Sequence, residues 1–487
     1  MDREAEVRAR LADEVGALGG DAPQRVALVY PSPYTVAMSS LGFQTIYREI
    51  NGRPQSVAER AFLPDDPKDT SPLRTYEARR PVGDYPVIAL SVAFELELAG
   101  VVTVLERAGL PLLSEDRDDR HPLVLAGGPL TNSNPLPLAP YADAILMGEA
   151  DETVHEALDI IFDAGSRRAA VEGLAAIPSC FVPSVHGDAM PGGAQCDDLR
   201  LPAWAPIRTP RTELSNMFLL EAERGCSRGC KYCVMRRSTN GGMRIVPIER
   251  ILDRIPEDAP KVGLVGAAVS DHPKIVELIR TLSAQGRGVS LSSLRPDRLR
   301  DEFVEALALA GARTLTTALD AASQRLRDSI DRRARERHLL RVAELARKHG
   351  FRQLKLYMIV GLPDETDEDI DELIRFATEL SRIQPLSLGI APFVAKRNTP
   401  LDGAPFAGVR EVDRRLKYLR RGLRGRVDLR ATSARWAYVE YLLAQGGQAE
   451  GRAVADAVHA GGDFGAYKRT FEALPDDRDR RALRVVS

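Results

Sequence analysis

The sequence predicts an α/β protein with two parallel-sheet domains in series, a doubly wound (Rossmann-like) domain and a partial (β/α)6, TIM-like barrel, followed by a helical C-terminal region. Three observations predict this class. Short apolar runs alternate with amphipathic stretches from residue 25 onward, as in the strand–helix units of parallel sheets. A segment rich in proline and glycine interrupts the alternation at 163–214, and the pattern becomes helical after residue 405. A chain of 487 residues has room for about three domains.

The first domain is predicted over residues 25–162, after a charged helix within 1–24. Its expected elements are buried strands at 25–32, 85–93 and 121–129, and a strand, a tight turn and a helix at 142–161. A ligand of a doubly wound sheet binds at the carboxyl ends of the strands. Residues 163–214 are predicted to be a linker, with room for a short hairpin.

The second domain is predicted over residues 215–405 as a partial barrel of strand–helix units. Its expected strands are 217–223, 261–267, 288–294, 313–319, 353–361 and 386–393. The chemistry of such a barrel lies at the carboxyl ends of its strands. The final range, 406–487, is expected to be helical and begins with an amphipathic helix that is rich in arginine. We interpret these arginines as a solvated face, with an RNA-contacting patch as the alternative.

The composition is that of an ordinary globular protein, with 44% hydrophobic and 28% charged residues. A formal net charge of −2 gives no overall reason to expect a polyanionic partner. The N-terminal segment does not have the pattern of a secretory signal, and no apolar run approaches the ~18 residues that span a membrane. The sequence therefore predicts a cytoplasmic protein with reduced thiols and no membrane partner.

Three of the five cysteines, Cys226, Cys230 and Cys233, form a C-x-x-x-C-x-x-C loop directly after the first barrel strand. Thiolates suit zinc or iron–sulfur sites. A structural zinc needs four ligands, usually from two paired sets, and the sequence offers no second pair. Ordinary [4Fe–4S] clusters take four protein thiolates, so three would leave one iron open. The pattern favours such a cluster, and the other two cysteines, Cys180 and Cys196, are interpreted as ordinary thiols.

With this loop the chain resembles the radical S-adenosylmethionine (radical SAM) superfamily over roughly residues 216–405. In that family SAM binds the open iron through its amino and carboxylate groups. An electron from the cluster then breaks a sulfonium C–S bond and yields a 5′-deoxyadenosyl radical. This step needs a cluster potential toward the −700 mV end of the biological range.

The resemblance implies SAM-binding positions at the ends of the barrel strands. The tyrosine before the third cysteine and the segment GLPDET match positions near the adenine in the family. The family's Gly-Gly-Glu-type segment, which binds the methionine amine, is replaced here by GLVGAAVSDHP, which leaves a serine and an aspartate as candidates. The SAM-binding residues implied by the resemblance are Tyr232, Ser270, Asp271, Ser293, Arg295, Asp320, Arg327 and Gly361. The alternative is that the two arginines are surface residues at helix starts and that Asp320 caps a helix. No catalytic side chain is identified.

Residues 25–162 resemble the cobalamin-binding-type domain that precedes the barrel in a large radical SAM subgroup. The matching segments are VALVYPSPY, IALSV and LAGGPLTNSNPLPLAPYADAILMGEAD. The resemblance implies cobalamin contacts at Ser91, Gly127, Gly128 and Gly148, where glycines let backbone N–H groups approach a nucleotide tail. The loop after the first strand contains no histidine, so a cobalamin bound here would lack a histidine ligand from it. The alternative is a vestigial domain that serves packing or dimerisation.

The favoured hypothesis is a radical SAM enzyme, specifically a cobalamin-dependent methyltransferase that acts at an unactivated carbon. A second hypothesis is a cobalamin-independent radical SAM enzyme for hydrogen abstraction, rearrangement or sulfur insertion. Methylthiolation is disfavoured because the radical SAM members that catalyse it usually have three further N-terminal cysteines, and no cysteine precedes Cys180 here. A third is a non-catalytic iron–sulfur or zinc protein. The expected partner is a one-electron reductant such as flavodoxin or ferredoxin. The basic residues around the cluster loop could receive this reductant, screen the negative charge of the cluster or contact an acidic substrate; they are Arg224, Arg228, Lys231, Arg236 and Arg237. The substrate, a small molecule, peptide or RNA, is not indicated.

Overall fold

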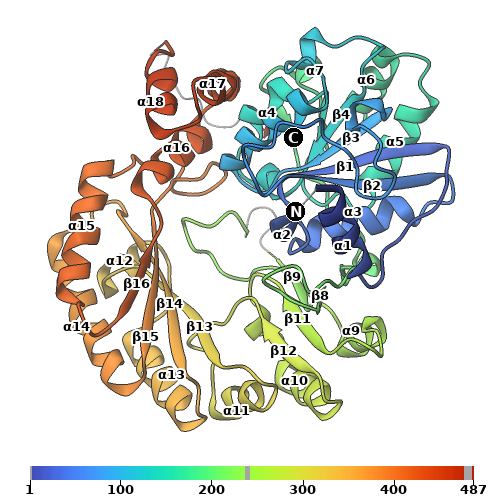
Figure 1. Cartoon of the computed structure of the whole chain (residues 1–487). Helices are drawn as coiled ribbons and strands as arrows, with labels where there is room; N and C mark the ends of the chain where they lie inside the picture. The colour runs from blue at the N-terminus through green and yellow to red at the C-terminus, as the bar shows by residue number, and fades with distance from the viewer. Residues whose placement is uncertain (1–2, 236–241, 476–484, 487) are drawn as a thin grey trace. The chain divides into compact units, whose positions relative to one another are not determined.

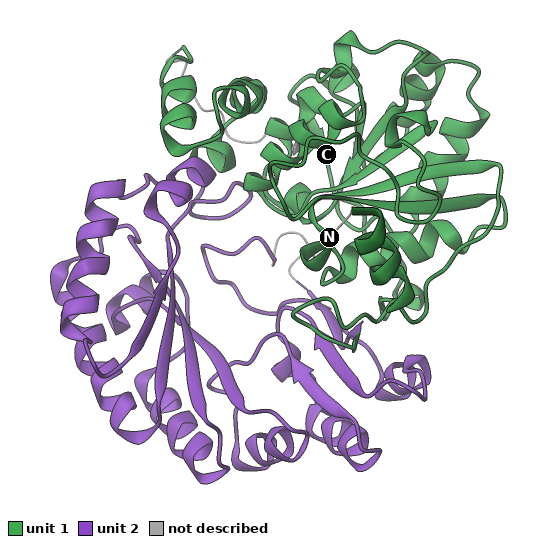
Figure 2. Ribbon diagram, viewed as in Figure 1, with its two compact units in different colours: residues 1–218, 442–487 green, residues 219–441 purple. Residues whose placement is uncertain are grey.

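The computed structural model describes residues 3–235, 242–475 and 485–486. The chain divides into two compact units, one of residues 1–218 and 442–487 and one of residues 219–441 (Figure 2). Among the described residues, no helix combines the length and the apolar character that crossing a bilayer would require.

The first unit is built on a six-stranded sheet with the order β2-β1-β3-β4-β5-β6 (Figure 1). The strands from β1 to β5 pair in parallel and β6 is antiparallel to β5. The main elements are α1 Arg3–Ala12, β1 Gln24–Pro33, α2 Tyr34–Ala37, α3 Leu41–Asn51, β2 Ser56–Leu63, β3 Val87–Ser91, α4 Leu98–Arg107, β4 Leu123–Gly127, β5 Ala144–Leu146, α5 Thr153–Asp163, α6 Arg167–Ala175, β6 Cys180–Phe181, α7 Pro183–His186 and β7 Met190–Pro191. The order 2-1-3-4-5 is the flavodoxin-like doubly wound order, in which ligands bind where the connections reverse direction, between β1 and β3.

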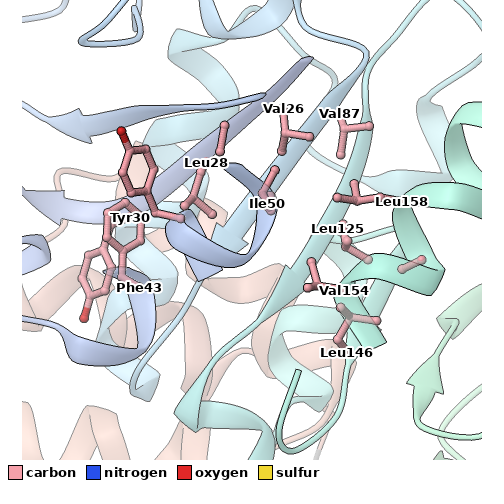
Figure 3. Packing of buried hydrophobic residues seen from close by; sticks show 14 of the residues in the cluster. Val26, Leu28, Tyr30, Phe43, Ile50, Val87, Leu125, Leu146, Val154 and Leu158 are labelled. Atoms are coloured by element: carbon pink, nitrogen blue, oxygen red, sulfur yellow. The ribbon is translucent and has the colours of Figure 1, made fainter. Parts of the chain in front are cut away.

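The core of this unit forms because β1 is apolar on both faces. Val26, Leu28 and Tyr30 alternate along the strand and pack toward Phe43 and Ile50 of α3 (Figure 3). The same cluster continues across β3, β4 and β5 to α5. Tyr30 and Phe43 meet edge to face with ring centroids 5.5 Å apart. Such continuous apolar runs are typical of parallel strands buried on both faces, which is why the predicted strands were recognisable.

The edge strand β2 is absent from the sequence-based prediction. Its residues are buried almost throughout, yet they include Glu59 and Arg60, which interrupt the apolar pattern. Arg60 is fully buried and pairs with Glu14 at 2.7 Å and with Glu77 at 2.6 Å. A buried charge is tolerated when it is paired and hydrogen-bonded, so a tertiary ion network makes this strand possible.

The range predicted as a linker, 163–214, contains α6 and β6, and β6 extends the sheet of the first unit. The last helices, α17 Gln448–His459 and α18 Phe464–Glu472, belong to this unit. The Tyr141 hydroxyl donates to the carbonyl oxygen of Gly451 in α17, and Arg452 of α17 pairs with Glu115 at 3.0 Å.

The second unit holds all the strands predicted for the barrel (Figure 1). Its main elements are β8 Met217–Glu221, β9 Glu223–Gly225, β10 Met243–Ile245, α9 Ile248–Arg254, β11 Lys261–Val265, α10 Ile275–Ala284, β12 Gly288–Leu291, α11 Asp301–Leu309, β13 Thr314–Asp320, α12 Gln324–Ser329, α13 Glu336–Lys348, β14 Gln353–Val360, α14 Asp367–Ile383, β15 Leu386–Pro392, α15 Val409–Gly422, β16 Asp428–Ala431 and α16 Ala434–Gln445.

Two differences from the predicted six-unit barrel appear in this unit. In the described residues the strands form a three-stranded sheet, β12-β11-β8, and a four-stranded sheet, β13-β14-β15-β16, rather than one continuous sheet. The strand β16 also lies in the region that was expected to be helical, where it pairs in parallel with β15. Its sequence, DLRA, carries too little apolar character to be recognised without its neighbour.

Candidate metal centre and cofactor sites

The three cysteines lie in a compact loop that follows β9. The Cys226 N–H donates to the carbonyl of Gly242, and the Arg228 N–H donates to Cys226 Sγ at 3.4 Å. The Cys233 N–H donates to the carbonyl of Cys230 at 3.2 Å, which closes a turn between the second and third cysteines. These bonds fix the loop at the end of the β8–β9 segment, as the sequence predicts.

The thiols are close enough to influence one another. Burial raises the pKa of Cys233, and the neighbouring Cys230 and Cys226 raise it further. Burial likewise raises the pKa of Cys226. Three neighbouring thiolates, one buried and two half-buried, repel each other unless a cationic metal group compensates their charge, and this donor set therefore fits a metal cluster.

The spacing of the sulfur atoms is wider than a single zinc ion requires. Tetrahedral zinc, at about 2.3 Å from each sulfur, holds the sulfurs about 3.8 Å apart. In the part of the chain that the structure describes, these three cysteines are not among the sets of ligand atoms that all lie within 4.8 Å of one another. At least one pair of these sulfur atoms is therefore farther apart than a single zinc ion would hold it.

A segment after α12 supports the cysteine loop, and sequence reasoning missed it. The Lys231 N–H donates to the Ile330 carbonyl at 3.0 Å, and Lys231 Nζ donates to the Ser329 carbonyl at 2.8 Å. Arg332 lies beside Cys230 and forms an ion pair with Asp320 at 2.5 Å. No motif marks Arg332 in the sequence, because only the fold brings the end of α12 to the loop.

Asp320 is the last residue of β13, and its carboxylate lies between Tyr232 and Arg332. Its φ of 68° lies in the left-handed region, which is strained for a non-glycine residue and is maintained only by its surroundings. The hydroxyl of Tyr232 donates to its carboxylate, while Arg332 neutralises it. Burial and the nearby Asp320 carboxylate raise the pKa of Tyr232, so its hydroxyl remains a donor. The structure thus brings Tyr232 and Asp320 together.

The loops after β11 and β12 gather four of the expected SAM-binding residues. Ser270 Oγ accepts the Arg295 N–H at 3.0 Å, and the Arg295 guanidinium forms an ion pair with Asp271. Ser293 Oγ donates to the Gly266 carbonyl at 2.9 Å and accepts the Val269 N–H at 3.1 Å. These side chains organise one another, and their contact with SAM stays a prediction.

The two predicted arginines are not surface residues. Arg295 is 6% exposed and Arg327 is fully buried, so the alternative that places them on the surface is wrong. Arg327 donates to the Ala321 carbonyl at 3.1 Å and to Gln324 Oε1 at 3.3 Å. Its guanidinium therefore braces the turn between β13 and α12, and any contact with SAM would be additional.

The basic residues of the cysteine loop are mostly paired. Arg224 binds Glu221 at 2.8 Å, and Arg228 binds Asp297 at 3.2 Å, which ties the loop to the end of β12. Arg236 and Arg237 lie outside the described residues.

Glu223 is a second residue that sequence reasoning missed. It is fully buried, and its Oε1 accepts the Ala268 N–H at 2.6 Å, within the segment that replaces the family's Gly-Gly-Glu pattern. Its Oε2 has no hydrogen-bond partner in the described structure. Burial, with the nearby carboxylates of Glu221 and Asp271, raises the pKa of Glu223 to about 7. A Cβ at Gly266 would lie 2.2 Å from Glu223 Oε1, so a larger residue there would displace this carboxylate.

In the first unit, the expected cobalamin residues lie at the carboxyl edge of the sheet, where Ser91 and Gly127 are neighbours in the β3–β4 register. Gly128 has a φ of 108°, and a Cβ there would lie 2.6 Å from the Val92 carbonyl oxygen. A Cβ at Gly148 would lie 2.6 Å from the Ala194 carbonyl oxygen. Packing of the chain on itself therefore explains these two glycines, and their contact with cobalamin stays a prediction.

Comparisons with known proteins agree with this site. A family model described as "Radical SAM superfamily" matches residues 221–377, and one described as "Radical SAM proteins, N-terminal" matches residues 42–183. The chain is therefore a radical SAM enzyme, a class that implies a [4Fe–4S] cluster and SAM. The residues present fit this requirement, since three cysteines of one loop provide the thiolates.

Two relatives match different shares of the chain. The uncharacterized protein MJ0966 of Methanocaldococcus jannaschii is 27% identical over 420 residues, which are 82% of this chain and 84% of that protein. A ribosomal protein uS12 methylthiotransferase, RimO of Geobacter sulfurreducens, is 28% identical over 204 residues, 38% of this chain and 44% of its own length. This chain thus spans less than half of that methylthiotransferase.

Solved structures share the fold across both units. The radical SAM methyltransferase TsrM of Kitasatospora setae, solved with cobalamin and a [4Fe–4S] cluster, gives a TM-score of 0.55 at 15% identity, covering 80% of this chain and 78% of TsrM. The cobalamin-dependent SAM radical enzyme OxsB gives 0.50 at 13% identity, covering 73% of this chain and 52% of OxsB. The doubly wound and radical SAM architectures predicted from the sequence are confirmed as a fold.

Proposed function

We propose that this chain is a cobalamin-dependent radical SAM methyltransferase that acts at an unactivated carbon. The observation that carries the proposal is the presence, in one chain, of a three-cysteine loop and of a sheet in the order 2-1-3-4-5. In doubly wound domains with this strand order, ligands bind at the carboxyl ends of β1 and β3, where the connections reverse direction. The fold shared with TsrM and OxsB supports the same pairing of cofactors.

In this proposal each part of the second unit has a task. Cys226, Cys230 and Cys233 hold the cluster, and the free oxygen of Glu223 accepts an N–H from the SAM amino group. When bound, the cluster and SAM supply a one-electron reductive cleavage of a sulfonium bond, and cobalamin supplies methyl transfer. The electron comes from a flavodoxin- or ferredoxin-type reductant. The buried Arg332–Asp320 pair keeps the cysteine loop and Tyr232 in place.

Two apolar side chains near the carboxyl ends of β1 and β3 are exposed: Val36 of α2 is 47% exposed, and Phe94, which follows β3, is 44% exposed. Residues 31–43, which run from the end of β1 into α3, contain no histidine, so a bound cobalamin would receive no imidazole ligand from this segment.

Measurement of iron, sulfide and cobalamin in one anaerobically reconstituted preparation tests this function. We expect about four irons per chain and about one tightly bound cobalamin. Turnover of the correct substrate should release both 5′-deoxyadenosine and S-adenosylhomocysteine, since SAM provides the radical and the methyl group. A preparation that retains the cluster but no cobalamin would contradict the proposal.

A cobalamin-independent radical SAM enzyme is the second candidate. The match to a ribosomal protein methylthiotransferase, RimO, over 38% of this chain keeps sulfur insertion among its reactions. Formation of 5′-deoxyadenosine without S-adenosylhomocysteine would favour it. The non-catalytic hypothesis is not supported, since the chain belongs to an enzyme superfamily.

A further inference from the structure

The amphipathic helix α15 contacts the loop that follows β14 through one arginine. Arg415 Nη1 donates to Glu365 Oε2 at 2.6 Å, and Nη2 donates to the backbone carbonyl of Glu365 at 2.7 Å. Arg415 Nε also pairs with Glu411, one turn earlier on the same helix, at 2.7 Å. A guanidinium that binds a side chain and the backbone of one residue fixes that residue's position more strictly than a single ion pair does.

Glu365 in turn fixes Gly361, the first residue of the GLPDET segment. The same oxygen, Oε2, accepts the Gly361 N–H at 2.6 Å. Gly361 has a φ of 86°, in the left-handed region that favours glycine. A Cβ at Gly361 would lie 3.5 Å from Val412 Cγ2 of α15, so the helix also packs directly against this turn.

The Gly361 N–H and the Arg415 guanidinium both favour the ionised form of the Glu365 carboxylate. Glu365 is buried, and its Oε1 has no hydrogen-bond partner in the described residues. Burial raises the pKa of Glu365 to about 7, although Gly361 and Arg415 act to lower it, and the nearby Asp369 adds to the rise. Without the guanidinium, this side chain would take up a proton more readily and would accept the Gly361 N–H more weakly.

We propose that Arg415 is a positioning residue that holds the loop at the end of β14 in its SAM-binding form through Glu365 and Gly361. The inference rests on the proposed SAM site at this loop. It gives the arginine-rich helix a specific task in the enzyme, beyond that of a solvated surface. Its effect should fall on SAM binding rather than on the cluster, because Arg415 contacts neither the cysteines nor the segment 329–332 in the described structure.

The neighbouring Arg414 provides a matched control. It lies on the same helix and forms an ion pair with Asp367 of α14, which joins α15 to α14. It also pairs with Glu411 of its own helix at 2.8 Å. It does not contact Glu365 or Gly361 in the described structure. Loss of general helix–helix attachment should therefore be common to both variants, whereas loss of the loop geometry should be specific to Arg415.

The test compares Arg415→Gln, Arg415→Lys and Arg414→Gln in the full-length, reconstituted holoenzyme. We expect Arg415→Gln to raise the KM and the equilibrium dissociation constant for SAM about fivefold, with kcat at saturating SAM within about twofold of wild type. Arg415→Lys should recover part of the affinity, because it restores charge but not the two-point contact. Arg414→Gln should stay within about twofold on every SAM parameter.

Hydrogen exchange provides a readout that does not need turnover. In protein without SAM, the peptide that contains Gly361 should exchange faster in Arg415→Gln than in Arg414→Gln or wild type. Equal SAM affinity and equal exchange in both glutamine variants would overturn the inference. A wild-type protein that binds SAM but forms no 5′-deoxyadenosine would instead contradict the proposed function, while the binding and exchange comparison would still decide the role of Arg415.

Discussion

Replacement of Cys230 by alanine should abolish SAM cleavage, with a loss of about 10³-fold or more in 5′-deoxyadenosine formation under reducing conditions. A cluster held by three protein thiolates cannot lose one without loss or rearrangement of its irons. Cys230 is also the cysteine beside Arg332, so its removal separates the loop from the supporting segment after α12. Iron and sulfide analysis together with the visible absorption of the cluster would measure the loss directly.

The control for this experiment is Cys196→Ala, which removes another buried thiol from the other unit. Its iron content and SAM cleavage should match those of wild type. A Cys230→Ala protein that keeps a full cluster and cleaves SAM would disprove the ligand assignment. A single zinc ion in the anaerobically prepared wild type would do the same.

Replacement of Glu223 by glutamine should weaken SAM binding about 30-fold while the cluster remains intact. The carboxylate is buried and one of its oxygens is free to accept an N–H, so the change removes a charge-assisted hydrogen bond worth roughly 1.5–3 kcal/mol. Equilibrium binding of SAM to the oxidised cluster form would measure the effect. Iron content serves as the check that the adjacent cysteine loop is undisturbed.

The pH dependence gives this prediction a sign. Because burial raises the pKa of Glu223 to about 7, its ionised fraction grows as the pH rises through neutrality, and SAM affinity in wild type should grow with it. Glu223→Gln should lose this component of the pH dependence. Glu221→Gln is the comparison: Glu221 pairs with Arg224, and its charge helps to raise the pKa of Glu223, so this substitution should move the rise in affinity to lower pH without abolishing it. Equal changes in SAM affinity and in its pH dependence for the two substitutions would show that Glu223 has no specific role in SAM binding.

Most strands were predictable from the sequence because each is a continuous apolar run buried between helices. The edge strand β2 was not, since Arg60 and Glu59 break the run and become tolerable only through partners that lie far away in the sequence. The strand β16 was missed for a related reason, because the register of β15 rather than its own composition makes it a strand. Within the site, the spacing of the three cysteines was readable, and so was Tyr232, because they are local.

The sequence by itself determined the metal-binding loop, most strands of the two sheets and the class of enzyme, because each of these depends on residues close together in the chain. Only the tertiary structure decided how the site is supported. Glu223 meets the segment after β11, Arg332 meets Cys230 and Asp320, and Arg415 meets Glu365. These are charges buried far from their partners in sequence, and a charge can remain buried only where the fold supplies its counterpart.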